Sequence, residues 1–342
     1  MKNEKLVPIN KLNNQKLKEV FNDKSVLVVS AGFEERVLAF PRFINDKGYK
    51  FKKVIVVDYN NKSINEPTRS KLIEITKKFS AFQEILSLEN DKKIFCDSIQ
   101  GNEVVVDLSG FDRVQIFLLL YTLDEMMAKY NIVYTEAEKY YPLKNFYNEI
   151  KKGTENSDQA FDRYLDKEKI EFAYSYNCSL KQPKVFKGEL EPSKQFYLIA
   201  FLAFKRSRLQ AILQELEITN LICVLSSPVR KDLHWRKELQ KIVNWDLIRK
   251  SKCIELETLS PWKVVELLEN ITYKNMAYSK FNLVLAPLGS KMQTFGCYLF
   301  WYKHKEVSIL FSKPDKYFKA TYSESYRDTF LITGEDITRM KS

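Results

Sequence analysis

Glycine and histidine are both scarce in this sequence. Nine glycines and two histidines, His234 and His304, occur among its 342 residues. The glycines form neither a G-x-x-x-x-G-K-[ST] loop nor a G-x-G-x-x-G turn, so the chain has no glycine-rich cradle for phosphate. Two imidazoles also disfavour a metal site built from histidine ligands, and we expect no metal and no cofactor.

Cysteine is sparse too, and its pattern argues against two kinds of site. The five cysteines are odd in number and widely spaced, and no Cys-x-x-Cys pair occurs. Most lie inside apolar runs, as Cys223 does within residues 221–225. We therefore expect buried free thiols in a reducing compartment, with neither disulfides nor a zinc site.

Long apolar runs are missing as well. The longest, near residues 114–123, is too short to span a bilayer, and no N-terminal stretch has the apolar core of a signal peptide. We expect a soluble, cytoplasmic protein with no membrane partner. With 45% hydrophobic and 29% charged residues, the chain is typical of globular proteins and long enough for two domains.

Positive charge is in excess, with a formal net charge of +11 at pH 7. Such an excess can favour nucleic acid or another polyanion. Most of it comes from scattered lysines, however, which are common on solvated surfaces. Six arginines are more specific, because each follows a predicted strand, where a guanidinium can hold a phosphate or a carboxylate. They are Arg36, Arg113, Arg206, Arg208, Arg230 and Arg236.

Strand-like runs alternate with helical runs in both halves of the chain. The first half has β-branched runs at 25–30, 54–58, 103–109 and 131–135, and the second half has apolar runs at 196–204, 221–225, 253–256 and 281–286. Later strands are expected at 307–311 and 329–332. This alternation predicts parallel β-α-β units and an α/β fold with mainly parallel open sheets, whose ligand sites lie at the carboxyl ends of the strands.

A polar and aromatic interval separates the two halves. Residues 177–194 show little periodicity and include Pro183, Gly188 and Pro192. We therefore expect one domain at 1–176 and a second at 195–342, joined by a connection at 177–194.

The motif Gly32-Phe-Glu-Glu-Arg36 supplies two carboxylates and a guanidinium between a strand and a helix. Acids are favoured in the first turn of a helix by its macrodipole, which would explain Glu34 and Glu35 structurally. In the functional interpretation, Arg36 meets an anion, or one glutamate handles a ribose hydroxyl or a proton. Both interpretations remain open.

A second acidic loop reads Asp107-Leu-Ser-Gly-Phe-Asp-Arg113. Helix capping and a tight turn explain Ser109 and Gly110. They do not explain why an acid ends an otherwise buried strand. Asp107 is therefore a candidate site residue.

The sharpest candidate is the turn Gly289-Ser290-Lys291, which links an apolar strand to a helical run. A helix N-terminus presents unpaired backbone N–H groups, and this one adds a hydroxyl and an ammonium, a combination suited to phosphate. Plain helix capping is the alternative. Because the turn has donors but no base, it is better suited to holding a phosphate than to cleaving one.

Five segments together resemble a known group of proteins: SAGFEERVLAF, VVVDLSGFDR, VYTEAEKYYP, DLHWRKEL and NLVLAPLGSKMQTFG. The set is similar to a poorly characterised bacterial family of two tandem Rossmann-like domains that is associated with defence-type gene neighbourhoods. The last segment also resembles the Gly-Thr-Lys turn of CARF-type domains, which sense cyclic oligonucleotides. Here the turn has Ser290 in place of threonine, and Pro287 and Leu288 before it weaken the likeness. The resemblance implies a nucleotide-responsive defence component.

The leading hypothesis is a nucleotide- or nucleic-acid-sensing module of a bacterial, anti-phage defence system. Its ligand would be a nucleotide, an oligonucleotide or a nucleic-acid end, and its partner a protein effector or a second copy of the chain. The residues assigned to the ligand are Gly289, Ser290 and Lys291 for a phosphate, Arg36, Arg113 and Arg206 for positive charge, and Asp107 for a ribose.

The alternative is a nucleotide-processing enzyme, such as a glycosidase, a transferase or a phosphohydrolase. Glu34, Glu35 or Asp107 would then act as base or nucleophile, which requires a carboxylate in a cleft. A third hypothesis is a scaffold that only holds partner proteins. It gains if side chains fill the space at the strand ends.

Overall fold

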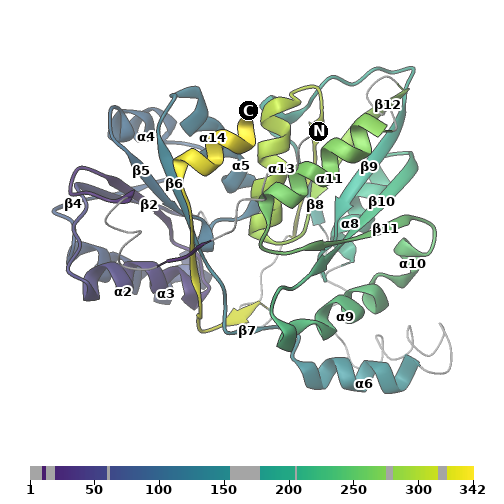
Figure 1. The fold of residues 1–342 in the computed structure, drawn as a ribbon, viewed down its shortest axis with the longest axis horizontal. Helices are drawn as coiled ribbons and strands as arrows, with labels where there is room; N and C mark the ends of the chain where they lie inside the picture. Colours follow the sequence, from purple (N-terminus) through teal and green to yellow (C-terminus); the bar gives the residue numbers. More distant parts are fainter. Residues whose placement is uncertain are drawn as a thin grey trace. The chain divides into compact units, whose positions relative to one another are not determined.

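The chain folds into two compact units, each built on its own β-sheet (Figure 1). The computed structural model describes residues 10–12, 20–59, 62–154, 178–204, 206–274, 280–314 and 322–342. One unit comprises Met1–Tyr141 and Phe318–Ser342, and the other comprises Pro142–Tyr317. The chain thus leaves the first unit, builds the second and returns to the first.

The first unit contains a seven-stranded sheet in the order β1-β16-β6-β5-β2-β3-β4. The strands are β1 (Asn10–Lys11), β2 (Val26–Ser30), β3 (Lys53–Val57), β4 (Phe82–Leu86), β5 (Val104–Asp107), β6 (Tyr130–Thr135) and β16 (Thr329–Ile332). The five strands from β6 to β4 run parallel, and β16 is antiparallel to β6 and to β1. Because β2 lies between β5 and β3, the parallel strands have the 3-2-1-4-5 order of a Rossmann-like sheet.

The helices of this unit cover both faces of its sheet. They are η1 (Glu35–Leu38), α2 (Ala39–Asp46), α3 (Lys62–Lys77), α4 (Lys92–Ile99), η2 (Leu108–Gly110), α5 (Arg113–Glu125) and α14 (Gly334–Lys341). Figure 1 shows α2 and α3 on one face and α4 and α5 on the other, as right-handed crossovers require. The core on the α2 side joins Val54 and Val56 of β3 to the buried rings of Phe40, Phe51 and Phe79.

The second unit repeats this strand order with five parallel strands, β11-β10-β9-β12-β13. They are β9 (Gln195–Phe201), β10 (Ile218–Ser227), β11 (Lys252–Glu257), β12 (Phe281–Pro287) and β13 (Ser308–Ile309). Its helices are α6 (Lys144–Thr154), η3 (Lys184–Phe186), α8 (Ser207–Glu215), η4 (Lys231–Leu233), α9 (Trp235–Val243), α10 (Trp245–Ile248), α11 (Pro261–Lys274) and α13 (Lys291–Lys303). The prediction of two Rossmann-like α/β domains with mainly parallel sheets is confirmed.

The two units do not follow the linear division expected from the sequence. β16 pairs with β6 over the register Thr135↔Thr329 to Ile132↔Ile332, which places the late strand in the first sheet. The expected connection also contributes to the second unit, because β8 (Cys178–Lys181) pairs with β14 (Phe311–Pro314), and Phe186 is fully buried. A run of apolar residues predicts a strand but does not specify which sheet it joins.

Helix α13 is buried over most of its length, from Met292 to Trp301. It packs against α11, and the contact is closest at Gly296. A Cβ atom at this position would lie 2.5 Å from the Pro261 carbonyl oxygen and 2.5 Å from Val264 Cβ. Glycine is therefore required here by the close approach of two helices.

None of the helices in the described part of the chain is both long enough and apolar enough to span a membrane.

Candidate functional site

The turn Gly289-Ser290-Lys291 lies at the switch point of the second sheet. It follows β12, which neighbours β9, and the connections of these two strands leave in opposite directions. A Cβ atom at Gly289 would overlap the Gln293 side-chain oxygen and touch Phe201 Cβ at 3.3 Å, so a larger residue would have to displace the Gln293 amide. The strand order thus brings the turn to the place where open α/β sheets bind ligands.

Ser290 is the N-cap of α13 and forms a complete capping box. Its hydroxyl accepts a hydrogen bond from the Gln293 N–H at 3.1 Å, and the Ser290 N–H donates to the Gln293 side chain at 3.0 Å. The hydroxyl also donates to the Thr258 carbonyl at 2.7 Å. These contacts support the capping interpretation of Ser290, whereas Lys291, which is half-buried, begins the helix at its positive end.

Two buried glutamines occupy the space beyond the strand ends of this unit. The Gln293 amide accepts from the Ser226 hydroxyl at 2.9 Å and donates to the Leu256 carbonyl at 3.3 Å. Gln240 accepts from the Ser226 N–H at 2.7 Å and donates to the Leu202 carbonyl at 2.8 Å. A ligand at the switch point must therefore lie outside this amide layer. Gln293 was not among the candidates from the sequence. The signal that could have identified it is a polar residue inside an otherwise apolar helix.

Most of the strand-end arginines have partners within their own unit. Arg206 forms an ion pair with Asp246, and Arg230 forms one with Asp232 at 2.7 Å. Arg236 donates to the Pro142 carbonyl at 3.0 Å and stacks over the Phe204 ring at 4.3 Å. The other two arginines lie in helices: Arg208 is buried within α8, and Arg113 is the half-buried first residue of α5. These pairings reduce the positive charge that the sequence led us to expect at the strand ends.

In the first unit, Glu34 and Arg36 form a buried ion pair. Two guanidinium–carboxylate contacts measure 2.9 and 2.8 Å, and Arg36 also donates to the Tyr134 hydroxyl at 2.9 Å. Ser323 donates to the Glu34 carboxylate at 2.6 Å, which ties the returning C-terminal segment to this loop. Burial would lower the pKa of Arg36, but the charge of Glu34 and the nearby tyrosines raise it well above its ordinary value, so the guanidinium stays charged.

Asp107 lies at the switch point of the first sheet, between β5 and β2. It is 2% exposed, and its carboxylate accepts from the Ser109 N–H at 2.9 Å. Gly32 and Gly110 bring the two loops together, because a Cβ atom at Gly32 would lie 2.8 Å from the Gly110 carbonyl oxygen. The Tyr59 hydroxyl donates to that same carbonyl at 2.7 Å. Protein atoms thus close the strand-end crevice around Asp107.

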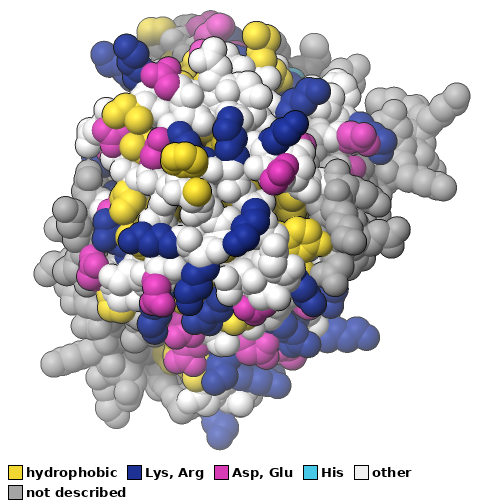
Figure 2. Space-filling view, turned by 90° about the vertical axis from the view of Figure 1, so that its left-hand side faces the viewer, with side chains coloured by type: hydrophobic (Ala, Val, Ile, Leu, Met, Phe, Trp, Pro, Cys, Tyr) yellow, Lys and Arg dark blue, Asp and Glu magenta, His cyan; other side chains and the backbone are white. Residues whose placement is uncertain are grey.

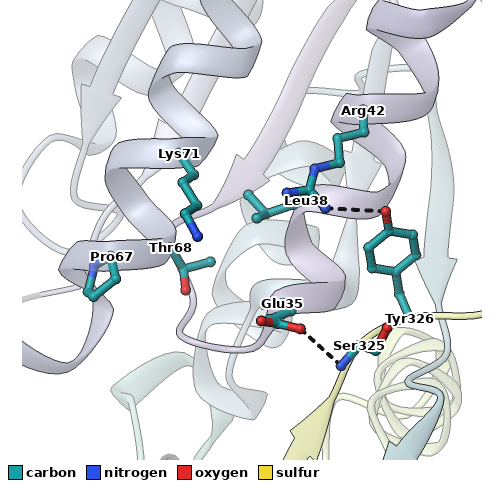
Figure 3. A pocket seen from close by; sticks show the side chains of 8 residues that line it. All are labelled: Glu35, Leu38, Arg42, Pro67, Thr68, Lys71, Ser325 and Tyr326. Atoms are coloured by element: carbon teal, nitrogen blue, oxygen red, sulfur yellow. Dashed lines mark hydrogen bonds between the residues drawn. The ribbon is translucent and has the colours of Figure 1, made fainter.

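Glu35 differs from Glu34 because its side chain is exposed and lines a cavity of about 230 Å³ (Figure 3). The eight lining residues come from η1, α2, α3 and the segment before β16: Glu35, Leu38, Arg42, Pro67, Thr68, Lys71, Ser325 and Tyr326. Of these, only Glu35 was a candidate from the sequence. The others carry no local motif, since the tertiary fold brings them together.

Charge on the outer surface is mixed on the face that Figure 2 shows. Lysine and arginine side chains lie among aspartate and glutamate, and apolar side chains form small separate groups. This face therefore offers no broad surface of one sign for a nucleic-acid backbone. Among the residues that the structure describes, no cluster of three or more His, Cys, Asp or Glu side chains could hold a metal ion.

No protein-family model matches the sequence, and no curated protein matches it. Among solved structures, the chain is similar to a type III CRISPR defence DNA nuclease activated by cyclic oligoadenylate, with a TM-score of 0.47 and 9% identity. That match covers 81% of this chain but 63% of the nuclease chain. The chain is also similar to the methyltransferase domain of bacterial CtHen1-CN, with a TM-score of 0.24 and 19% identity over 50% of this chain and 86% of that one. Both TM-scores are below 0.5, and the resemblance to a defence-associated family therefore stays a prediction.

Proposed function

We propose that this protein is a nucleotide- or nucleic-acid-sensing component of a bacterial defence system and acts with a partner effector. The observation that carries the proposal is the position of Lys291, which begins α13 at the switch point of a Rossmann-like sheet. An ammonium at a helix N-terminus adds to the positive end of the helix dipole, which favours a phosphate. The family resemblance of the motifs supplies the defence context.

The residues around Lys291 take different roles in this proposal. Gly289 allows the close turn and Ser290 fixes the helix start, so both act by positioning the backbone and the Lys291 ammonium. Arg206 lies after β9, on the other side of the switch point, and adds a guanidinium whose charge Asp246 partly offsets. In the first unit, Arg36 is paired with Glu34 and Asp107 is buried, and a ligand contact by either residue stays a prediction.

Isothermal titration calorimetry tests the proposal with cyclic oligonucleotides, mononucleotides and short DNA or RNA. We expect one class to bind, and we expect Lys291→Ala to weaken that binding about tenfold through the loss of a charge-assisted contact. Lys303→Ala is the matched control, because it removes the same charge from the other end of α13. The proposal fails if no ligand of the panel binds, or if both variants bind as the unmodified chain does.

A nucleotide-processing activity is the second candidate, and the cavity beside Glu35 is the observation that favours it. Glu34 is paired with Arg36, and Asp107 is enclosed, so Glu35 is the carboxylate among the three that faces a cavity. Turnover of a labelled nucleotide pool that is lost in Glu35→Gln would support an enzyme. Turnover that survives this substitution would exclude Glu35 as the base or nucleophile.

A further inference from the structure

We propose that the cavity of the first unit binds a hydroxylated phosphate monoester, that is, a sugar phosphate. The site is formed by Arg42 and Lys71 at the phosphate and by Glu35 at the sugar hydroxyls (Figure 3). It belongs to a different unit from the turn at Gly289-Ser290-Lys291 and does not depend on the function proposed for that turn.

Arg42 and Lys71 both line the cavity and both carry a positive charge. Arg36 and Arg69 of the same unit have carboxylate partners at 2.8 Å. Across the described ranges of the chain, neither Arg42 nor Lys71 forms an ion pair with a carboxylate. Two cations and the single carboxylate of Glu35 leave the lining of this cavity with a net positive charge, which favours an anionic ligand.

The guanidinium of Arg42 is held in place by a neighbouring aromatic ring. It donates to the Tyr326 hydroxyl at 3.2 Å and lies 5.9 Å from the centre of that ring. One N–H is used in this contact, so the remaining donors of the planar fork are available to ligand oxygens. Figure 3 shows Lys71 and Thr68 on the opposite side of the cavity from Arg42 and Tyr326. A phosphate between them meets positive charge from two sides.

The Glu35 carboxylate restricts the chemical class of the anionic ligand. The lining carries two positive charges, on Arg42 and Lys71, and one negative charge, on Glu35. The carboxylate accepts one hydrogen bond, from the Ser325 N–H at 3.2 Å, and a carboxylate has capacity for several more. A bare anion is repelled by Glu35, whereas a ligand with an anionic end and hydroxyl groups places a donor against it. Acidic residues bind ribose hydroxyls in this way in other Rossmann-like sites.

The Thr68 hydroxyl adds a further acceptor. It donates its hydrogen to the Phe33 carbonyl at 3.2 Å, so its oxygen can only accept from a ligand or from Lys71. An acceptor beside a cation suits a ligand that has both a phosphate and hydroxyl groups. Like Glu35, Thr68 therefore favours a ligand that has hydroxyl groups as well as a phosphate.

The size of the cavity limits the ligand to a small molecule. Pockets for drug-sized ligands occupy roughly 300 to 1,000 Å³, and this cavity measures about 230 Å³. This volume suits a phosphate with one sugar ring. One wall is also fixed by an unusual backbone: Ser325 has a φ of 54°, in the left-handed region, and this conformation accompanies the hydrogen bond from its N–H to Glu35. Strained residues of this kind are concentrated at binding sites.

Calorimetry on the full chain with ribose 5-phosphate, inorganic phosphate and ribose tests the site. We expect ribose 5-phosphate to bind most tightly, inorganic phosphate more weakly, and ribose without detectable heat. Arg42→Gln and Lys71→Gln should each weaken ribose 5-phosphate binding about tenfold. Lys77→Gln is the matched control, since it removes one charge from the same helix outside the cavity and should leave binding unchanged.

Glu35→Gln separates a sugar phosphate from a simple phosphate. We expect it to tighten inorganic phosphate binding and to reduce the preference for ribose 5-phosphate. Equal binding of the two ligands, unaffected by Glu35→Gln, would overturn the sugar part of the proposal. Absence of binding, or unchanged binding in Lys71→Gln, would overturn the site itself. Because Lys71 is exposed, that variant should fold normally, and its circular dichroism spectrum checks this.

Discussion

Replacing Arg36 with methionine tests whether the ion pair with Glu34 stabilises the first unit. The substitution keeps an unbranched side chain of similar length but removes the two contacts to Glu34 and the hydrogen bond to Tyr134. Of the hydrogen bonds described for Glu34, its carboxylate would then keep the one from the Ser323 hydroxyl. A buried charge would be left without its counter-ion.

The size of the effect follows from the burial of the pair. The side chains of Arg36 and Glu34 are 6% and 10% exposed, so solvent screens them little. Removing one partner of such a buried pair destabilises a protein by about 3–5 kcal/mol. For a unit of this length, that loss corresponds to a fall in Tm of roughly 6–20 °C. Urea unfolding, monitored in the first unit by hydrogen exchange, measures the change.

Two further variants make the test specific. Glu34→Gln combined with Arg36→Met should recover part of the lost stability, because no buried charge remains. Arg36→Lys keeps the charge but loses the planar fork, and we expect an intermediate loss. If Arg36→Met changes the free energy of unfolding by less than about 0.5 kcal/mol, the range of ordinary surface substitutions, the pair does not stabilise this unit. A ligand role for Arg36 would then regain support.

Three other predictions concern the second unit. Gly296→Ala should lower the free energy of unfolding by about 1–3 kcal/mol through overpacking against α11, as urea unfolding would show. Ser290→Ala should lower it by about 0.5–2 kcal/mol through the lost cap, while nucleotide affinity falls less than in Lys291→Ala. Burial raises the pKa of Cys223 to about 11, so at pH 8 iodoacetamide should label the exposed Cys253 and spare Cys223. Equal labelling of both thiols would contradict that burial.

The sequence was sufficient to predict the fold class, because the strands leave a local signal. β2 and β5 are apolar runs that end at a polar residue, and β12 contains the apolar run Leu283 to Ala286; these patterns depend only on neighbouring residues. The cap formed by Ser290 was likewise among the interpretations that its position allowed, since capping acts over one helical turn.

What the sequence could not specify were partnerships between distant residues. Arg206 forms an ion pair with Asp246, which lies 40 residues further along the chain, and no rule of local spacing predicts such a pair. Arg42 and Lys71 line one cavity from two helices that follow different strands. The charge of each arginine was visible in the sequence, but whether a carboxylate neutralises it depends on tertiary packing. The partners of the strand-end arginines and the lining of the cavity at Glu35 are therefore not specified by any local pattern.

The route of the chain through the two units bears on how the protein folds during synthesis. β7 (Lys139–Tyr140) and β15 (Ser323–Glu324) pair with each other, so the segments that leave and re-enter the first unit lie side by side. The ribosome must therefore synthesise the whole second unit before β16 can complete the first sheet. Domains generally fold as they emerge, so the second unit can mature while the edge of β6 still awaits its neighbour. A nascent chain halted before residue 329 would expose that edge, and chaperone binding to stalled chains would reveal it.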